Sequence, residues 1–162
     1  MSYKFENIKI LVVEDNPAMT DIIKSVLIAL GFKDVHTAKD GEMGYRVFQN
    51  IKPDLVITDW MMQPIDGLTL SMMIRNNADS PDPYVPIIML TGYAVPERVK
   101  QARDSGINEF LMKPFKADDL YKRIQFIIER PRQYVQNETF FGPDRRRVQK
   151  EIDDNEDKRK GQ

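Results

Sequence analysis

Five short runs with the character of β-strands alternate with segments of helical periodicity over the first 130 residues, and this alternation limits the possible folds more than any other feature. The strand-like runs are 9–13, 34–38, 55–58, 86–90 and 109–112, each of strand length. Between them, apolar side chains recur at helical spacing, and in the first segment the predicted apolar stripe is Ile22, Ile23, Val26, Leu27 and Leu30. The first of these segments predicts a helix with Asn16 as its cap and Pro17 at its first position, ended by Gly31.

Strands that alternate with helices form a parallel sheet with helices on both faces. Right-handed crossovers leave few strand orders, and the natural choice is the α/β, flavodoxin-like doubly wound fold. We therefore expect a five-stranded parallel sheet in the order 2-1-3-4-5 with five helices. In this architecture ligands bind beyond the carboxyl ends of the strands, at the switch between strands 1 and 3.

The character of the chain changes near residue 130. Residues 131–144 mix aromatic side chains with Asn, Gly and Pro without a clear period, and residues 145–162 contain twelve charged side chains. Such a segment buries too little apolar surface to offset the entropy of ordering it. We interpret residues 1–130 as one domain and 131–162 as a charged C-terminal tail. Residues 131–147 are expected to dock on the domain's own surface, on a partner or on a second copy of the chain, with disorder or at most a marginal helix beyond Lys150.

Composition excludes several kinds of chemistry. The sequence has no cysteine, which excludes disulfides, thiolate metal sites and a cysteine nucleophile, and its single histidine, His36, excludes a multi-histidine zinc site. The formal net charge of −1 gives no reason to expect binding to nucleic acid or membranes. No apolar run approaches the roughly 20 residues of a membrane span. We expect a cytoplasmic protein.

Polar side chains stand at the carboxyl ends of four predicted strands. They are Glu14 and Asp15 after the first strand, Asp59 after the third, Thr91 after the fourth and Lys113 after the fifth. Three crowded carboxylates are unfavourable unless a cation lies among them, and oxygen ligands without His or Cys select Mg²⁺. An aspartate can act as a nucleophile and form an acyl phosphate, with the metal and Lys113 neutralising the transferring oxygens.

These residues belong to a set of motifs that resembles the bacterial two-component response-regulator receiver domain, the CheY-like family. The resemblance covers roughly residues 7–130. Its motifs are Glu14-Asp15-Asn16, Asp59-Trp60, Asp66-Gly67, Leu90-Thr91-Gly92 and Lys113-Pro114-Phe115. The chain departs from the family at Gln63, where a proline is common four residues after the acceptor, and Pro64 follows instead.

The resemblance implies a role for each of these residues. Asp59 accepts a phosphoryl group from a histidine kinase or a histidine phosphotransfer protein. The implied Mg²⁺ ligands are Glu14, Asp15, Asp59 and the backbone carbonyl of Met61. Thr91 and Lys113 contact the phosphoryl group, and Phe110 is the aromatic switch that turns inward on activation. Met61 and Tyr93 flank the route of the attacking water, and neither carries a charge to position it, so slow autodephosphorylation is expected.

A protein of this kind is a switch rather than an enzyme, and Mg²⁺-dependent self-phosphorylation and slow autodephosphorylation are its only expected reactions. No output domain follows the receiver pattern, which favours signalling by docking or service as a phosphate relay or sink. The family implies a downstream protein target on the face of the fourth helix, fifth strand and fifth helix. The tail is a second candidate contact, and another copy of the chain is a further candidate partner.

Parts of the sequence are also compatible with two other functions. A nucleic-acid-binding regulator could use the basic run at 145–147 together with Lys150, yet five acidic residues between 151 and 157 offset that charge. A phosphatase of the haloacid dehalogenase type also uses an aspartyl nucleophile, and Asp66-Gly67 faintly resembles its motif. Pro64 stands where that motif requires a second aspartate, which excludes this function.

Overall fold

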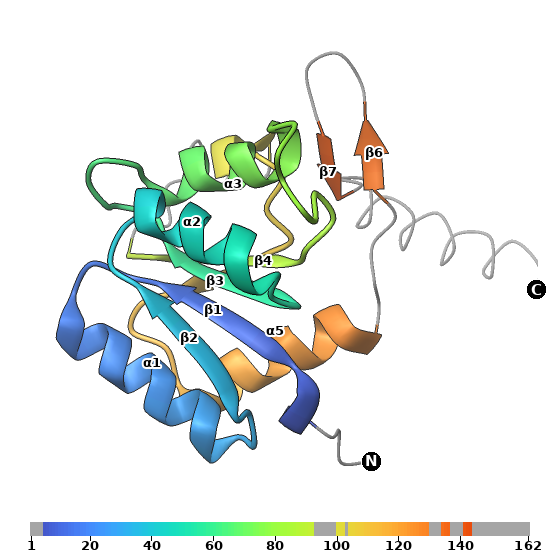
Figure 1. Cartoon of the computed structure of the whole chain (residues 1–162). Coiled ribbons are helices and arrows are strands. Elements are labelled where there is room, and N and C mark those ends of the chain that lie inside the picture. Colours follow the sequence, from blue (N-terminus) through green and yellow to red (C-terminus); the bar gives the residue numbers. More distant parts are fainter. Residues whose placement is uncertain (1–4, 93–99, 103, 130–133, 137–140, 144–162) are drawn as a thin grey trace, which may run out of the picture.

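The computed structural model describes residues 5–92, 100–102, 104–129, 134–136 and 141–143 (Figure 1). Its main sheet confirms the predicted fold, because five strands pair in parallel in the order β2-β1-β3-β4-β5. The strands are β1 (Lys9–Val13), β2 (Asp34–Ala38), β3 (Leu55–Asp59), β4 (Ile87–Thr91) and β5 (Glu109–Met112). Every residue of β3 and β4 is buried, as expected for central strands covered on both faces.

Helices follow the strands as the periodicity predicts. They are the 3₁₀ turn η1 (Phe5–Asn7), α1 (Pro17–Ala29), α2 (Gly41–Ile51), α3 (Gly67–Asn76) and α5 (Ala117–Glu129). Residues 100–102 and Asp104 are also helical and belong to the predicted fourth helix, whose earlier residues lie outside the described part of the chain.

Short polar side chains cap three of these helices. The Asn16 Oδ1 accepts from the N–H groups of Ala18 and Met19, at 3.0 and 3.3 Å, and Pro17 is the first residue of α1, as predicted. Asp40 caps α2, and Asp66 caps α3 by accepting from the Thr69 N–H at 2.8 Å. These caps set the points at which the chain turns from each strand end into its helix.

Helices lie on both faces of the sheet and form two separate cores. Figure 1 shows α1 and α5 on one face and α2 and α3 on the other. The α1–α5 face buries Phe5, Ile23, Leu27, Phe32 and Leu120 among others, and the α2–α3 face buries Phe48, Leu70 and Ile74. Side chains of β1 alternate between them, with Val12 in the first core and Val13 in the second.

A two-stranded hairpin follows α5. Its strands β6 (Tyr134–Gln136) and β7 (Phe141–Pro143) pair antiparallel, and β7 contacts α3 (Figure 1). The proposed docking element thus includes two strands, and the segment beyond Lys150 lies outside the described residues.

Candidate functional site

The carboxyl ends of the strands continue their backbone pairing for one residue, which aligns the site residues along one edge of the sheet. The Glu14 N–H donates to the Ala38 carbonyl at 3.0 Å, and the Trp60 N–H donates to the Leu90 carbonyl at 3.2 Å. The Lys113 N–H donates to the Thr91 carbonyl at 2.8 Å. The backbone therefore brings the predicted site residues together before any side chain is considered.

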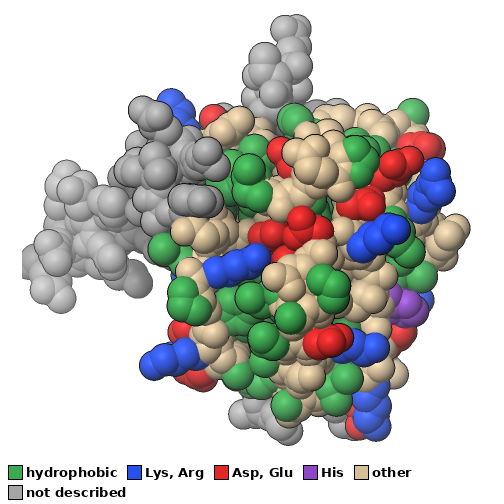
Figure 2. All heavy atoms as spheres, turned by 90° about the vertical axis from the view of Figure 1, so that its left-hand side faces the viewer, with side chains coloured by type: hydrophobic (Ala, Val, Ile, Leu, Met, Phe, Trp, Pro, Cys, Tyr) green, Lys and Arg blue, Asp and Glu red, His purple; other side chains and the backbone are tan. Residues whose placement is uncertain are grey.

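Three carboxylates converge at this edge. One oxygen from each of Glu14, Asp15 and Asp59 lies within 4.8 Å of the others. Glu14 and Asp59 are buried, whereas Asp15 is exposed. Figure 2, which faces the left-hand side of Figure 1, shows Asp and Glu side chains gathered at the centre of this face with Lys or Arg on both sides.

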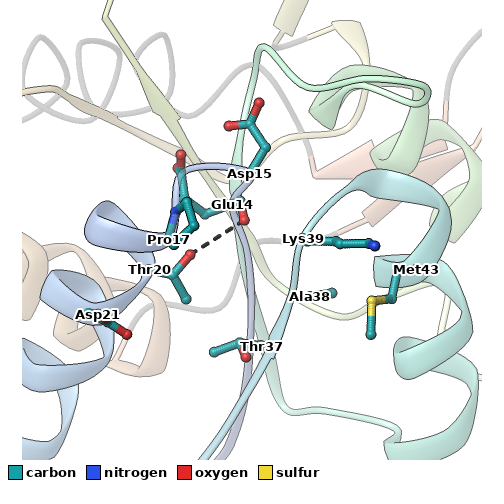
Figure 3. Close-up of a pocket in the computed structure, with 9 residues that line it drawn as sticks. All are labelled: Glu14, Asp15, Pro17, Thr20, Asp21, Thr37, Ala38, Lys39 and Met43. Atoms are coloured by element: carbon teal, nitrogen blue, oxygen red, sulfur yellow. Dashed lines mark hydrogen bonds between the residues drawn. The ribbon is translucent and has the colours of Figure 1, made fainter.

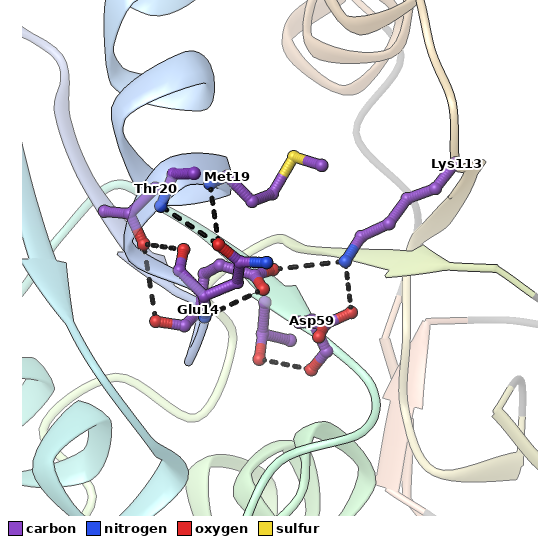
Figure 4. Close-up of polar contacts among 8 residues, drawn as sticks. Glu14, Met19, Thr20, Asp59 and Lys113 are labelled. Carbon is purple, nitrogen blue, oxygen red and sulfur yellow. Dashed lines mark hydrogen bonds and ion pairs between the residues drawn. The ribbon is translucent and has the colours of Figure 1, made fainter.

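Lys113 holds two of these carboxylates (Figure 4). Its Nζ lies 2.9 Å from the Asp59 Oδ1 and 3.3 Å from the Glu14 Oε2. The other Glu14 oxygen accepts from the Asn16 N–H at 3.3 Å. The ammonium thus neutralises part of the negative charge and keeps the Asp59 carboxylate in place.

Burial and charge shift two pKa values in the site. Burial, together with the nearby Asp59 charge, raises the pKa of Glu14, and Lys113 and the Asn16 N–H only partly offset this. Burial lowers the pKa of Lys113, but its hydrogen bond and ion pair with Asp59 and the charge of Glu14 outweigh burial and raise it. Lys113 is therefore a fixed positive charge at neutral pH.

The remaining predicted site residues differ in how the structure places them. Thr91 is buried as the last residue of β4, and Phe110 is half-buried against the α2–α3 core. The Met61 side chain is 55% exposed at the start of the β3–α3 loop. Tyr93 lies outside the described residues.

The contacts of the loop between β3 and α3 were not predicted from the sequence. The Gly67 N–H donates to the Trp60 carbonyl at 2.8 Å, and the Gly41 N–H donates to the Ile65 carbonyl at 3.1 Å. Asp66-Gly67 stands out in the sequence as a motif, but nothing in the sequence marks Gly41 as its neighbour. Such pairs depend on how closely two segments approach in the fold.

A pocket of about 280 Å³ opens beside the carboxylates, between the starts of α1 and α2 (Figure 3). Its lining includes Glu14, Asp15, Thr20, Lys39 and Met43. Because Asp15 belongs to both the pocket and the acidic cluster, the cluster is accessible from this side.

The donor set fits a divalent cation. Carboxylate oxygens are hard ligands of the kind Mg²⁺ prefers, and the group of candidate ligands in the described part of the chain contains no thiolate or imidazole. Three carboxylates against one ammonium also leave a net negative charge. Glu14, Asp15 and Asp59 are the residues that would hold the ion.

Comparisons with known proteins agree with this geometry. The family model "Response regulator receiver domain" matches residues 10–125, and the chain belongs to that family. Chemotaxis protein CheY-3 of Vibrio cholerae is 35% identical over 125 residues, which cover 77% of this chain and 95% of that protein. Chemotaxis protein CheY of Pseudomonas aeruginosa is 34% identical over 122 residues, covering 75% and 97%.

Solved structures give the same result. The receiver domain of the sensor histidine kinase PA1611 of Pseudomonas aeruginosa is 31% identical, with a TM-score of 0.68 over 75% of this chain and 98% of that one. That structure has a magnesium ion coordinated in its active-site cleft. CheY4 of Vibrio cholerae is 28% identical with a TM-score of 0.68, covering 74% and 98%.

The predicted class is therefore confirmed: this chain is a CheY-like receiver domain of two-component signalling, a class of switch proteins rather than enzymes. No helix in the described part of the chain is long and apolar enough to cross a membrane.

Proposed function

We propose that the chain accepts a phosphoryl group on Asp59 from a histidine kinase or a histidine phosphotransfer protein. The observation that carries the proposal is the Asp59 carboxylate, which lies 2.9 Å from the Lys113 ammonium inside a cluster of three acidic side chains. Ligands of open parallel sheets bind beyond the carboxyl ends of the strands, and buried carboxylates with a specific charge partner are candidate functional groups.

In the proposed reaction an Asp59 oxygen attacks the phosphorus of a phosphohistidine. The new O–P bond forms as the P–N bond breaks, and the leaving imidazole nitrogen takes up a proton. Lys113 keeps Asp59 oriented and offers its ammonium to a phosphoryl oxygen. Glu14, Asp15, Asp59 and the Met61 carbonyl would hold a Mg²⁺, which would neutralise charge on the transferring oxygens.

We propose that Thr91 and Phe110 pass the signal to a protein target. Thr91 ends β4 and directly follows Leu90, the strand partner of Asp59, and its hydroxyl would donate to a phosphoryl group on Asp59. Phe110 lies on the neighbouring strand β5, paired with Met89, and Met112 of β5 is 50% exposed. The face of the fourth helix, β5 and α5 is therefore the proposed output surface, alongside the C-terminal segment.

A phosphotransfer profile tests this function. The full chain is mixed with Mg²⁺ and radiolabelled phospho-kinases of the host, alongside Asp59→Asn and the exposed-site control Asp54→Asn. We expect acid-stable label on the wild-type chain and on Asp54→Asn, and its loss in Asp59→Asn only. Wild-type levels of label on Asp59→Asn would show that the acceptor is another residue.

The alternative of nucleic-acid binding has less support. The basic run at 145–147 lies outside the described residues. One relative, the DNA-binding regulator RpaA of Synechocystis, is 31% identical over 122 residues, but these cover only 49% of that protein. The similarity to this relative therefore gives no support for DNA binding by this chain.

A further inference from the structure

The β3–α3 loop, residues 60–66, is held at two points by backbone hydrogen bonds. At its end, the Gly67 N–H donates to the Trp60 carbonyl and closes the loop on itself. At Ile65 the loop is bound from outside, because the Gly41 N–H at the start of α2 donates to the Ile65 carbonyl at 3.1 Å. α2 is thus the element against which this loop rests.

There is no room for a side chain at Gly41. A Cβ there would lie 2.8 Å from the Ile65 Cγ2 and 2.9 Å from the Ile65 Cβ, and it would overlap the Ile65 carbonyl oxygen. A backbone oxygen cannot rotate away as a side-chain end can. Any residue with a Cβ at this position must therefore push the loop and α2 apart.

A displacement at Ile65 would reach the site because the loop is short and anchored along its length. Only five residues separate Ile65 from Asp59, and the side chains of Trp60 and Met62 are buried. Met61 lies between these two anchors. Movement of the loop would thus change where the Met61 carbonyl points relative to the three carboxylates.

We propose that Gly41 is a positioning residue for the Mg²⁺ site: it seats the β3–α3 loop against α2 so that the Met61 carbonyl faces the acidic cluster. Gly41 is not a member of the acidic cluster and acts through Ile65. The inference rests on the proposed function, which makes the Met61 carbonyl a metal ligand.

The test compares Gly41→Ala with Gly44→Ala in the same helix. A Cβ at Gly44 would also meet the core, at 3.0 Å from the Val13 Cγ2 and 3.5 Å from the Leu70 Cδ2, but it would contact side chains and not the loop. Both substitutions overpack α2. Only Gly41→Ala should displace the β3–α3 loop.

Mg²⁺ binding to the full chain is measured by calorimetry and by the fluorescence of Trp60, and urea unfolding without Mg²⁺ gives the stability of each variant. We expect Gly41→Ala to weaken Mg²⁺ binding about tenfold or more, as changes in residues that support metal ligands commonly do. Gly44→Ala should keep its Mg²⁺ affinity within about twofold whatever its loss of stability. The proposal would be overturned if both variants bound Mg²⁺ with wild-type affinity, or if both lost the same amount of affinity.

A measurement on the wild-type protein covers the case in which Gly41→Ala does not fold. If the Gly41–Ile65 contact and the metal site are coupled, Mg²⁺ must stabilise the contact as much as the contact favours Mg²⁺. Hydrogen exchange at the Gly41 amide should therefore slow when Mg²⁺ is added. An unchanged rate at saturating Mg²⁺ refutes the coupling, whereas a wild-type chain that binds no Mg²⁺ refutes the proposed function itself.

Discussion

Lys113 interacts with carboxylates that would also bind a metal ion. Its Nζ contacts Asp59 and Glu14, two of the three carboxylates available to Mg²⁺. A cation held by these carboxylates would therefore be repelled by the ammonium.

Replacing Lys113 with methionine should change metal binding and chemistry in opposite directions. We expect Lys113→Met to bind Mg²⁺ about tenfold more tightly, because the competing charge is gone, and to take up phosphate more slowly. Calorimetry and the phosphorylation rate measure the two effects. Lys39→Met, an exposed lysine of the neighbouring pocket, is the control. Weaker Mg²⁺ binding in Lys113→Met would contradict this account.

The lifetime of the acyl phosphate depends on the residues around the attacking water. Met61 is exposed beside Asp59 and has no charge to position water. We expect the wild-type phosphoprotein to decay at least about tenfold more slowly than a Met61→Asn, Tyr93→Glu double variant. The reason is that a positioned general base accelerates the attack of water. The decay of purified, labelled protein is the measurement. A double variant that decays no faster would remove the argument.

Among the elements, α2 is tied to the α3–β4 loop by one buried phenol. The Tyr45 hydroxyl donates to the Asp79 Oδ1 at 2.6 Å, and burial with this bond raises the pKa of Tyr45 to about 12. The protonated phenol is the form that the fold favours. The contribution to stability is therefore fully present below pH 10 and is lost as the pH rises from 10 toward about 12.

Tyr45→Phe tests this tie. We expect it to lower the free energy of unfolding by about 1 kcal/mol at pH 7. The difference from wild type should shrink only above pH 10. Urea unfolding across pH gives the stability difference, and ultraviolet titration of both proteins identifies the late-ionising tyrosine. A difference that disappears by pH 8 would assign the effect to another group.

A second tie joins α3 to the segments before β4 and β5. Arg75 is buried, and its guanidinium donates to the carbonyls of Gly106, Pro83 and Val85 and to the Asn108 side chain, at 2.7 to 3.1 Å. The Asn108 Oδ1 also accepts from the Ile87 N–H. One side chain thus satisfies several buried acceptors at the amino ends of two strands.

Arg75→Leu should be severely destabilising, because it leaves several buried carbonyls without their donor. We expect a loss of about 3 kcal/mol or more in the free energy of unfolding. Arg46→Leu is the matched control, since Arg46 is exposed and pairs only with Glu42 one turn away among the described residues. That variant should stay within about 0.5 kcal/mol of wild type. Similar losses in both variants would contradict this role for Arg75.

At the scale of the whole molecule, the hairpin after α5 adds to the receiver fold. An isolated two-stranded hairpin is marginally stable in water, so the contact of β7 with α3 is the interaction expected to hold it. We expect deletion of residues 131–162 to lower the free energy of unfolding by about 1 kcal/mol and to speed hydrogen exchange in α3. Fast hydrogen exchange throughout 131–147 in the intact protein, both with and without a partner, would contradict the prediction that this segment docks.

Much of this organisation could be predicted from the sequence because it is set locally. Hydrophobic periodicity, helix-capping residues and polar residues at strand ends predicted the bounds of the five strands to within about one residue. They also predicted that Glu14, Asp15, Asp59 and Lys113 lie at one edge of the sheet. Helical spacing also put Ile22 on the apolar stripe of α1, but its side chain is 53% exposed. Ile23 and Leu27 face the sheet instead, and spacing alone does not locate the edge of a stripe.

The contacts that support the site could not be predicted in this way. Gly41 against Ile65 and Arg75 against Gly106 join segments 24 and 31 residues apart in sequence. Such contacts depend on the distance between layers after packing, and neither residue type indicates its partner. The sequence therefore predicted which side chains carry the chemistry but not the contacts that hold them.

The sheet that separates the two cores also separates the effects of substitutions in one core from those in the other. A substitution under α1 and α5 meets other side chains than one under α2 and α3, because buried strands lie between them. Effects at such distant sites add nearly independently. An evolving lineage, or a protein engineer, could thus remodel the α1 side while the opposite side keeps the contacts of its β3–α3 loop intact.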